Sequence, residues 1–209
     1  MLYSELQCSE AIHKAVERMG FAEMTEIQEK TIPVMLAGHD VIAKAPTGTG
    51  KTCAFGIPVA EHIQPENKYP QAVIMAPTRE LAQQIAEELS DLTYFMPEVQ
   101  VACVYGGANM EKQAKRLAEG CQIVVATPGR LMDHYKHHSI DISHVTQIVL
   151  DEADEMLNMG FYKDVRHIIE MMKARKALSM FSATISREVM DIGWLYQHNA
   201  EEITVQPRE

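Results

Sequence analysis

Apolar segments of strand length alternate with segments of helical periodicity along almost the whole chain. Within residues 79–92, Leu81, Ile85, Leu89 and Leu92 recur at the spacing of one helix face, which predicts an amphipathic helix. The strand-like segments span residues 40–45, 72–76, 99–105, 122–126, 147–150, 177–181 and 202–205. They are nearly all apolar rather than alternating, which predicts strands buried on both faces.

This alternation predicts the fold class. Nearly continuous apolar strands are typical of a parallel sheet with helices on both faces, and the strand–helix order indicates a doubly wound α/β domain. Residues 64–70 and 134–144 are predicted to be surface loops. With 209 residues and no repeat or long linker, residues 1–209 are expected to form a single domain. Ligands of such domains bind beyond the carboxyl ends of the strands.

Composition and charge narrow the class of protein. No apolar run reaches the roughly 18–20 residues needed to span a bilayer, and residues 1–20 lack the pattern of a signal peptide. A soluble cytoplasmic protein without a membrane partner is therefore expected. The net charge of −10 argues against a broad basic surface for nucleic acid. Four cysteines without C-x-x-C spacing favour reduced thiols over a disulfide framework or a zinc site.

A glycine-bearing loop follows the first predicted strand and precedes a helical segment. In this context, backbone N–H groups and a helix N-terminus bind phosphate oxygens, a lysine reaches the β- and γ-phosphates, and a Thr hydroxyl binds Mg²⁺. The strict pattern has Gly where this chain has Ala, which permits the same strand exit. A chance turn rich in Gly and Thr is the alternative. The candidate nucleotide-binding residues are Ala45, Pro46, Thr47, Gly48, Thr49, Gly50, Lys51 and Thr52.

Three carboxylates follow the predicted strand at 147–150, namely Asp151, Glu152 and Asp154. Such a cluster is unfavourable unless a cation offsets the repulsion. Asp151 is the candidate for holding the Mg²⁺ that bridges the phosphates, and Glu152 could orient and deprotonate an attacking water. Asp154 could approach another strand end. The alternative is an acidic first turn of a helix, where carboxylates are favoured.

Further short motifs follow other predicted strands, at the edge where a ligand should lie. They are PTRELA at 77–82, GG at 106–107, TPGR at 127–130 and SAT at 182–184. Thr78 and Thr127 are plausible N-caps, and Gly106 and Gly107 would permit close approach of a backbone. Hydroxyls, backbone N–H groups and helix N-termini bind sugar–phosphate without reading sequence. Ordinary turns and caps are the alternative for each motif.

In this order along the chain, APTGTGKT, PTRELA, GG, TPGR, DEAD and SAT resemble the DEAD-box family of ATP-dependent RNA helicases. Residues 20–28, GFAEMTEIQ, resemble the family's Q motif, with Met24 in place of the usual Pro. The resemblance implies an N-terminal RecA-like P-loop NTPase domain that uses ATP and Mg²⁺. It implies that Gln28 reads the adenine edge, and that Tyr3 or Phe21 stacks on the base. Thr25 and Gln28 also have the spacing of a capping box.

The resemblance further implies RNA as a partner. Hydrogen bonds from Ser182 and Thr184 towards the acids would couple nucleotide state to domain closure. Backbone N–H groups and hydroxyls that bind sugar–phosphate are neutral and do not enter a formal charge count. The net charge of −10 therefore weakens the RNA interpretation without refuting it. The residues that would grip the backbone of one RNA strand are Pro77, Thr78, Arg79, Gly106, Gly107, Thr127, Pro128, Gly129 and Arg130.

Nothing in the chain matches the motifs of the family's second RecA-like domain, which supplies the arginine fingers. We therefore expect this chain to be a monomeric half of the helicase core, a partner of that C-terminal domain. Alone it should bind adenine nucleotide, hydrolyse ATP negligibly and unwind nothing. A non-catalytic, nucleotide-responsive docking module and a DNA-directed motor are the competing hypotheses. His134, His137 and His138 are interpreted as a solvated helix end rather than a metal cluster.

Overall fold

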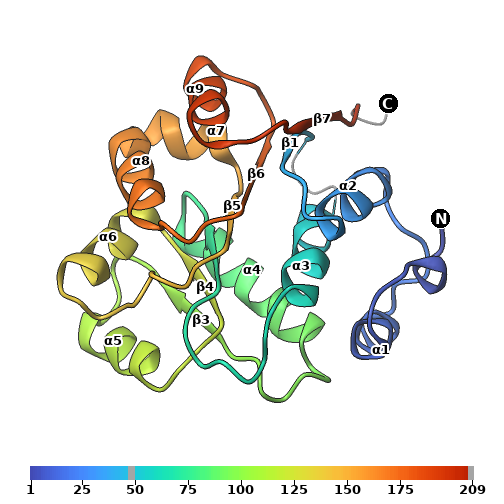
Figure 1. Cartoon of the computed structure of the whole chain (residues 1–209), viewed down its shortest axis with the longest axis horizontal. Helices are drawn as coiled ribbons and strands as arrows, with labels where there is room; N and C mark the ends of the chain where they lie inside the picture. Colours follow the sequence, from blue (N-terminus) through green and yellow to red (C-terminus); the bar gives the residue numbers. More distant parts are fainter. Residues whose placement is uncertain (47–49, 207–209) are drawn as a thin grey trace.

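A single parallel sheet forms the centre of the molecule. The computed structural model describes residues 1–46 and 50–206, and within them seven strands lie in the order β3-β4-β2-β5-β6-β1-β7 (Figure 1). Every neighbouring pair is parallel. The strands are β1 (Val41–Lys44), β2 (Ala72–Met75), β3 (Val101–Val104), β4 (Ile123–Ala126), β5 (Gln147–Leu150), β6 (Ala177–Ser182) and β7 (Glu201–Thr204). The predicted α/β class with a parallel sheet is confirmed, and strand boundaries differ from the predicted ones by at most two residues.

Helices connect the strands. The described helices are η1 (Tyr3–Glu5), α1 (Glu10–Arg18), α2 (Glu26–Leu36), α3 (Lys51–Glu61), α4 (Arg79–Leu92), α5 (Met110–Ala118), α6 (Pro128–Lys136), α7 (Ala153–Met156), η2 (Leu157–Phe161), α8 (Tyr162–Met171) and α9 (Arg187–Tyr196). The helix predicted at 79–92 coincides with α4. None of these described helices is long and apolar enough to cross a membrane.

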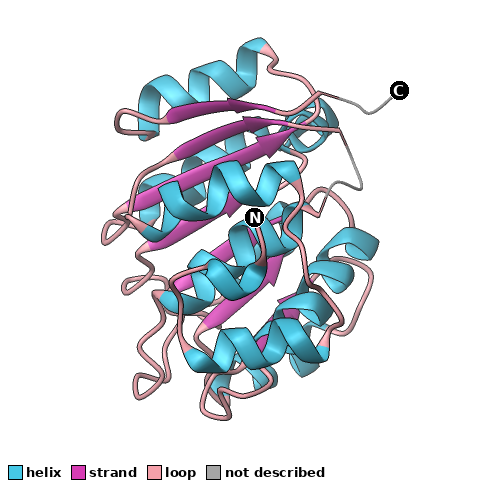
Figure 2. Ribbon diagram, turned by 90° about the vertical axis from the view of Figure 1, so that its right-hand side faces the viewer, coloured by secondary structure: helices cyan, strands magenta, loops and turns pink. Residues whose placement is uncertain are grey.

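Helices cover both faces of the sheet, which explains why its inner strands are mostly apolar (Figure 2). Along β2, Ala72 and Ile74 join a core formed with α1 to α4. The alternate residues Val73 and Met75 join a second core, formed with α5 to α9 on the opposite face. Successive side chains of a strand point to opposite faces, so the strands from β1 to β6 contribute to both cores, whereas β7 contributes only Ile203, to the first.

The predicted loop at 134–144 begins too early. Helix α6 continues to Lys136, and His134 is fully buried rather than part of a solvated helix end. The physical reason is a polar partner, because the imidazole Nε2 lies 3.1 Å from the Gln113 Oε1 of α5. A buried polar group is tolerated when it is hydrogen-bonded.

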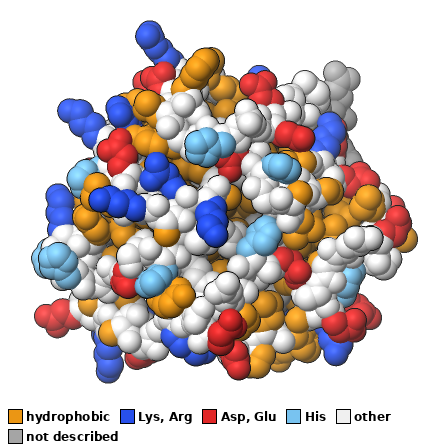
Figure 3. Space-filling view, viewed as in Figure 1, with side chains coloured by type: hydrophobic (Ala, Val, Ile, Leu, Met, Phe, Trp, Pro, Cys, Tyr) orange, Lys and Arg blue, Asp and Glu red, His pale blue; other side chains and the backbone are white. Residues whose placement is uncertain are grey.

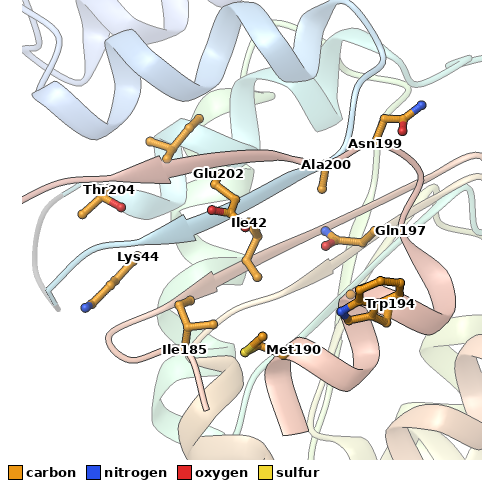
Figure 4. Close-up of a pocket in the computed structure, with 12 residues that line it drawn as sticks. Ile42, Lys44, Ile185, Met190, Trp194, Gln197, Asn199, Ala200, Glu202 and Thr204 are labelled. Carbon is orange, nitrogen blue, oxygen red and sulfur yellow. The ribbon is translucent and has the colours of Figure 1, made fainter. Parts of the chain in front are cut away.

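One face of the neighbouring strands β1 and β7 is only partly covered by helices. Between α9 and the strands β1 and β7 lies a hollow of about 440 Å³, with Ile42 and Lys44 on its floor and Met190 and Trp194 on the helix side (Figure 4). The Trp194 side chain is 86% exposed. None of the residues proposed above for nucleotide or RNA lines this hollow.

Candidate functional site

The predicted motifs lie together at one edge of the sheet. Since the described strands are all parallel, the segments that follow them emerge at the same end. Sheet hydrogen bonds continue into these segments and fix their relative positions. The Ala45 N–H donates to Ser182 O at 2.9 Å, the Asp151 N–H to Met75 O at 2.9 Å, and the Thr127 N–H to Val104 O at 3.1 Å.

Lys51, the first residue of α3, has a buried ammonium group. Gly50 is the N-cap of α3 in the left-handed region, with φ +79°. A Cβ at Gly50 would lie 2.7 Å from Gln28 Nε2, so any other residue would strain the backbone and displace the Gln28 amide. The Lys51 Nζ is 3.5 Å from Asp151 Oδ1 and has no hydrogen-bond partner among the described residues. A buried ammonium of this kind suits a phosphate anion. The predicted residues Thr47, Gly48 and Thr49 lie outside the described residues.

The two carboxylates that follow β5 lie in different environments. Asp151 is 2% exposed, and burial raises the pKa of its carboxyl, an effect that the Lys51 ammonium opposes. Glu152 is half-buried, and burial raises the pKa of its carboxyl; the Lys51 ammonium opposes this rise, and the neighbouring Asp151 adds to it. The Glu152 backbone is in the left-handed region, with φ +47°. Such strain costs of order 1–3 kcal/mol and is found preferentially at functional sites.

Asp154 is joined directly to the SAT segment that follows β6. Its Oδ2 accepts hydrogen bonds from the Thr184 N–H at 3.1 Å and the Thr184 hydroxyl at 2.8 Å. Its own N–H donates to Ser182 Oγ at 3.0 Å, and the Ser182 hydroxyl donates to Thr184 O at 2.6 Å. Burial opposes ionisation of Asp154, but these hydrogen bonds, led by that of Thr184, hold the pKa below its usual range. The structure therefore connects the acidic cluster to β6.

Gln28 connects the N-terminal segment to the phosphate loop. Its Oε1 accepts hydrogen bonds from the Tyr3 hydroxyl and, at 3.0 Å, from the Thr25 N–H, and its Nε2 donates to Gly50 O at 3.1 Å. Thr25 and Gln28 form the predicted capping box. Tyr3 is 4% exposed, whereas Phe21, stacked on it at 6.3 Å, is 44% exposed. Of the two aromatic candidates for the base, Phe21 is thus the one whose ring is open to solvent.

The oxygen donors of this site suit a divalent cation for which phosphate and water supply most of the ligands. Thr52 and Asp151 supply a hydroxyl and a carboxylate, and Mg²⁺ is usually held by one or two protein groups plus phosphates. No cluster of three or more His, Cys, Asp or Glu side chains suited to a metal occurs in the described part of the chain. Glu88 of α4, which the sequence did not single out, is a further carboxylate beside Thr52; burial raises the pKa of its carboxyl, and the Thr52 hydroxyl opposes that rise.

The segments after β2 and β3 contact each other. Thr78 caps α4, accepting the Leu81 N–H on its Oγ1 at 3.2 Å, as predicted. The Arg79 guanidinium lies over the Tyr105 ring, 4.9 Å from its centroid. Gly107 has φ +84°, and a Cβ there would be 3.8 Å from Arg79 Nη1. The PTRELA and GG motifs therefore form one surface.

The segment after β4 completes this surface. Thr127 is the N-cap of α6, as predicted, although its side chain makes no capping hydrogen bond. Pro128 follows at the first helical position, where an N–H would have no partner within the helix. The Arg130 Nη1 donates to Ala108 O at 3.0 Å and to Gln113 Oε1 at 3.1 Å. Lys and Arg side chains are interspersed with Asp and Glu on the face shown in Figure 3, without a continuous basic surface.

Comparison with known proteins agrees with this geometry. The family model described as DEAD/DEAH box helicase matches residues 25–192. Two relatives named ATP-dependent RNA helicase CshA are 46% identical over 209 residues, in Limosilactobacillus reuteri, and 47% identical over 207 residues, in Listeria monocytogenes. The chain is covered to 100% and 99% but spans only 42% and 40% of those relatives.

A solved structure shares the fold. The crystal structure of a DEAD box protein from the hyperthermophile Methanococcus jannaschii superposes with a TM-score of 0.91 at 39% identity, covering 99% of this chain and 56% of that one. The family match spans most of the chain and includes the residues gathered at the carboxyl edge of the sheet. The chain belongs to the DEAD/DEAH box helicase family.

Proposed function

We propose that this chain is the N-terminal, ATP-binding half of an ATP-dependent RNA helicase. The observation that carries the proposal is the buried Lys51 ammonium, paired with Asp151 beneath the Gly50 turn. This arrangement suits a nucleotide phosphate and its cation. The names of the relatives, which include ATP dependence and RNA helicase activity, support the same assignment.

The proposed chemistry is direct hydrolysis of the γ-phosphate. Lys51 binds the β- and γ-phosphates, while Thr52 and Asp151 hold Mg²⁺, which supplies charge neutralisation when bound. Glu152 orients and deprotonates the attacking water, and its raised pKa suits a general base. The water attacks in line without a covalent enzyme intermediate. Gln28 and Phe21 contact the adenine.

The RNA strand is proposed to lie over the carboxyl ends of β2, β3 and β4. Its backbone contacts hydroxyls, N–H groups and the two arginines Arg79 and Arg130. In the complete protein a second RecA-like domain closes on this one when ATP binds, and one RNA strand bends. Arginine fingers accelerate hydrolysis by about 10³–10⁵ in P-loop NTPases, so this chain alone, a monomer, should hydrolyse ATP negligibly.

An equilibrium titration with Mg·ADP and Mg·GDP in parallel tests the nucleotide site. We expect ADP to bind and GDP to bind much more weakly, since a guanine edge mismatches the Gln28 amide. Lys51→Ala should weaken ADP binding. Lys44→Ala is the matched control, because this lysine is exposed and belongs to the preceding strand. Equal binding of both nucleotides would refute the adenine contact, and no binding of either would refute the nucleotide site.

A comparison of RNA and DNA oligonucleotides of matched sequence tests which nucleic acid the protein binds. Backbone recognition of RNA includes the 2′-OH, which DNA lacks. We expect tighter binding of the RNA strand in the presence of nucleotide. Equal affinities would favour a DNA-directed motor.

A further inference from the structure

His134 is a buried histidine that none of the proposed chemistry uses. It lies on α6 with no exposed surface, and its Nε2 is 3.1 Å from Gln113 Oε1. Because an amide oxygen only accepts hydrogen bonds, the Nε2 must be the protonated nitrogen. The Nδ1 is buried and has no hydrogen-bond partner among the described residues. His134 therefore makes one hydrogen bond among the described residues, from its Nε2–H to the Gln113 Oε1.

That acceptor belongs to Gln113, which together with Arg130 contacts the backbone on both sides of the GG motif. Gln113 is 8% exposed, and its Nε2 donates to Tyr105 O at 3.0 Å, immediately before Gly106. Its Oε1 also accepts from Arg130 Nη1 at 3.1 Å, and the same Arg130 nitrogen donates to Ala108 O at 3.0 Å, immediately after Gly107. Carbonyls on both sides of the two glycines are thus fixed through Gln113 and Arg130.

The orientation of the Gln113 amide decides whether this arrangement holds. A flip would exchange its oxygen and nitrogen, turning NH₂ towards two donors and removing the bond to Tyr105 O. Two donors, Arg130 and His134, point at the amide oxygen and oppose the flip. If Arg130 turns to a phosphate, His134 remains as the donor that holds the amide.

We propose that His134 is a positioning residue for RNA binding, which acts by holding the Gln113 amide, and through it the GG loop, in place while Arg130 contacts RNA. This inference rests on the proposed RNA-binding function. It assigns to His134 no contact with RNA, nucleotide or the reacting atoms. Replacing His134 should therefore change the affinity for RNA, and it should do so only through Gln113.

The first experiment measures RNA-stimulated ATP hydrolysis by the full-length protein with His134→Leu and His134→Gln. Leucine removes the donor, whereas a glutamine NH₂ can occupy the position of Nε2. We expect His134→Leu to raise the RNA concentration for half-maximal stimulation about 2- to 10-fold, the effect of one lost neutral hydrogen bond. The KM for ATP should not change, and His134→Gln should restore most of the affinity. The exposed His137, in the same helix end, supplies the control His137→Leu.

A double-mutant cycle separates positioning from packing. If His134 acts through Gln113, His134→Leu should have no further effect on RNA affinity in a Gln113→Leu background. Additive effects, or wild-type RNA affinity in a folded Gln113→Leu protein, would overturn the proposal. If His134→Leu does not fold, the RNA affinity of Gln113→Leu alone still tests the proposal. A wild-type protein that RNA fails to stimulate would instead refute the proposed function itself.

Discussion

At the scale of single residues, the site gathers groups that would be unfavourable without a ligand. The Lys51 and Asp151 side chains are 7% and 2% exposed and lie 3.5 Å apart. Burying such a pair costs desolvation free energy that the mutual attraction often fails to recover, so stability is a weak reason to keep it. A nucleotide phosphate and a divalent cation would each take one member as a partner. The pair is therefore better explained by ligand binding than by folding.

Glu152 should separate catalysis from binding. In the full-length protein, Glu152→Gln keeps the size and hydrogen-bonding capacity of the side chain but cannot accept the proton of the attacking water, so ATP should still bind and turnover should be abolished. A second variant, Glu152→Gly, should raise the free energy of unfolding by about 1 kcal/mol by relieving the left-handed strain at this residue. Nucleotide titration, turnover and chemical denaturation check these outcomes. Near-normal turnover of Glu152→Gln would remove Glu152 from the role of base.

His134 should give the protein a specific loss of stability in mild acid. Burial, and then the nearby Arg130 and His137, lower the pKa of His134 from 6.5, while Asp133 opposes them. The unfolded chain then binds this proton more readily than the folded one. The stabilisation is complete above about pH 6.5 and is lost as the pH falls towards the folded-state pKa.

Urea denaturation at about pH 7.5 and about pH 5.5 measures this loss. His134→Gln has no group that titrates in this range, so its free energy of unfolding should fall less than that of the wild type between the two values. Equal losses would show that other groups account for the acid sensitivity.

At the scale of elements, the start of α3 is fixed from two sides. Gly50 gives the chain the left-handed turn that begins the helix, and Gln28 of α2 donates to its carbonyl oxygen. Because Gln28 is also bonded to Tyr3 and Thr25, the phosphate loop is connected to η1 and to the first turn of α2. A change in the loop can therefore be transmitted to the N-terminal segment.

Gly50→Ala should affect both stability and ligand binding. The left-handed backbone alone should cost about 1–2 kcal/mol with any Cβ, and the Cβ would also displace Gln28 Nε2, which lies 2.7 Å away. Gly38→Ala is the matched control, since Gly38 has φ +87° but no atom within 4 Å of its added Cβ. Both variants should melt at a lower temperature, but only Gly50→Ala should bind Mg·ADP more weakly. Unchanged ADP affinity would show that the loop tolerates the displacement.

Much of this arrangement could be predicted from the pattern of the chain. Since parallel strands end at one edge, motifs that follow them had to meet there, and Asp154 does meet Ser182 and Thr184. The environment of His134 could not be predicted, because it depends on how α5 packs beside α6. The same holds for Glu88, whose carboxylate meets Thr52 only through the contact of α3 with α4. Side-chain partners across helices have no local sequence signal.

At the scale of the whole molecule, RNA binding should depend weakly on salt. The net charge is −10, and among the described residues of the proposed RNA surface only Arg79 and Arg130 have full positive charges. Two phosphate contacts at about 0.7 each give a slope of about −1.4 for log affinity against log salt on single-stranded RNA. Binding measured over a series of salt concentrations checks this value. A slope steeper than about −3 would indicate a larger basic surface.

The hollow beside α9 also has an optical consequence. The chain contains one tryptophan, and the 86% exposed indole of Trp194 stands at the rim of that hollow. Its fluorescence should therefore be red-shifted and readily quenched by acrylamide, as for an indole in water. Because no other indole contributes, a blue shift on adding any binding partner would report contact at this one surface. The chain thus contains its own single-site fluorescent probe, at the partly covered face of β1 and β7.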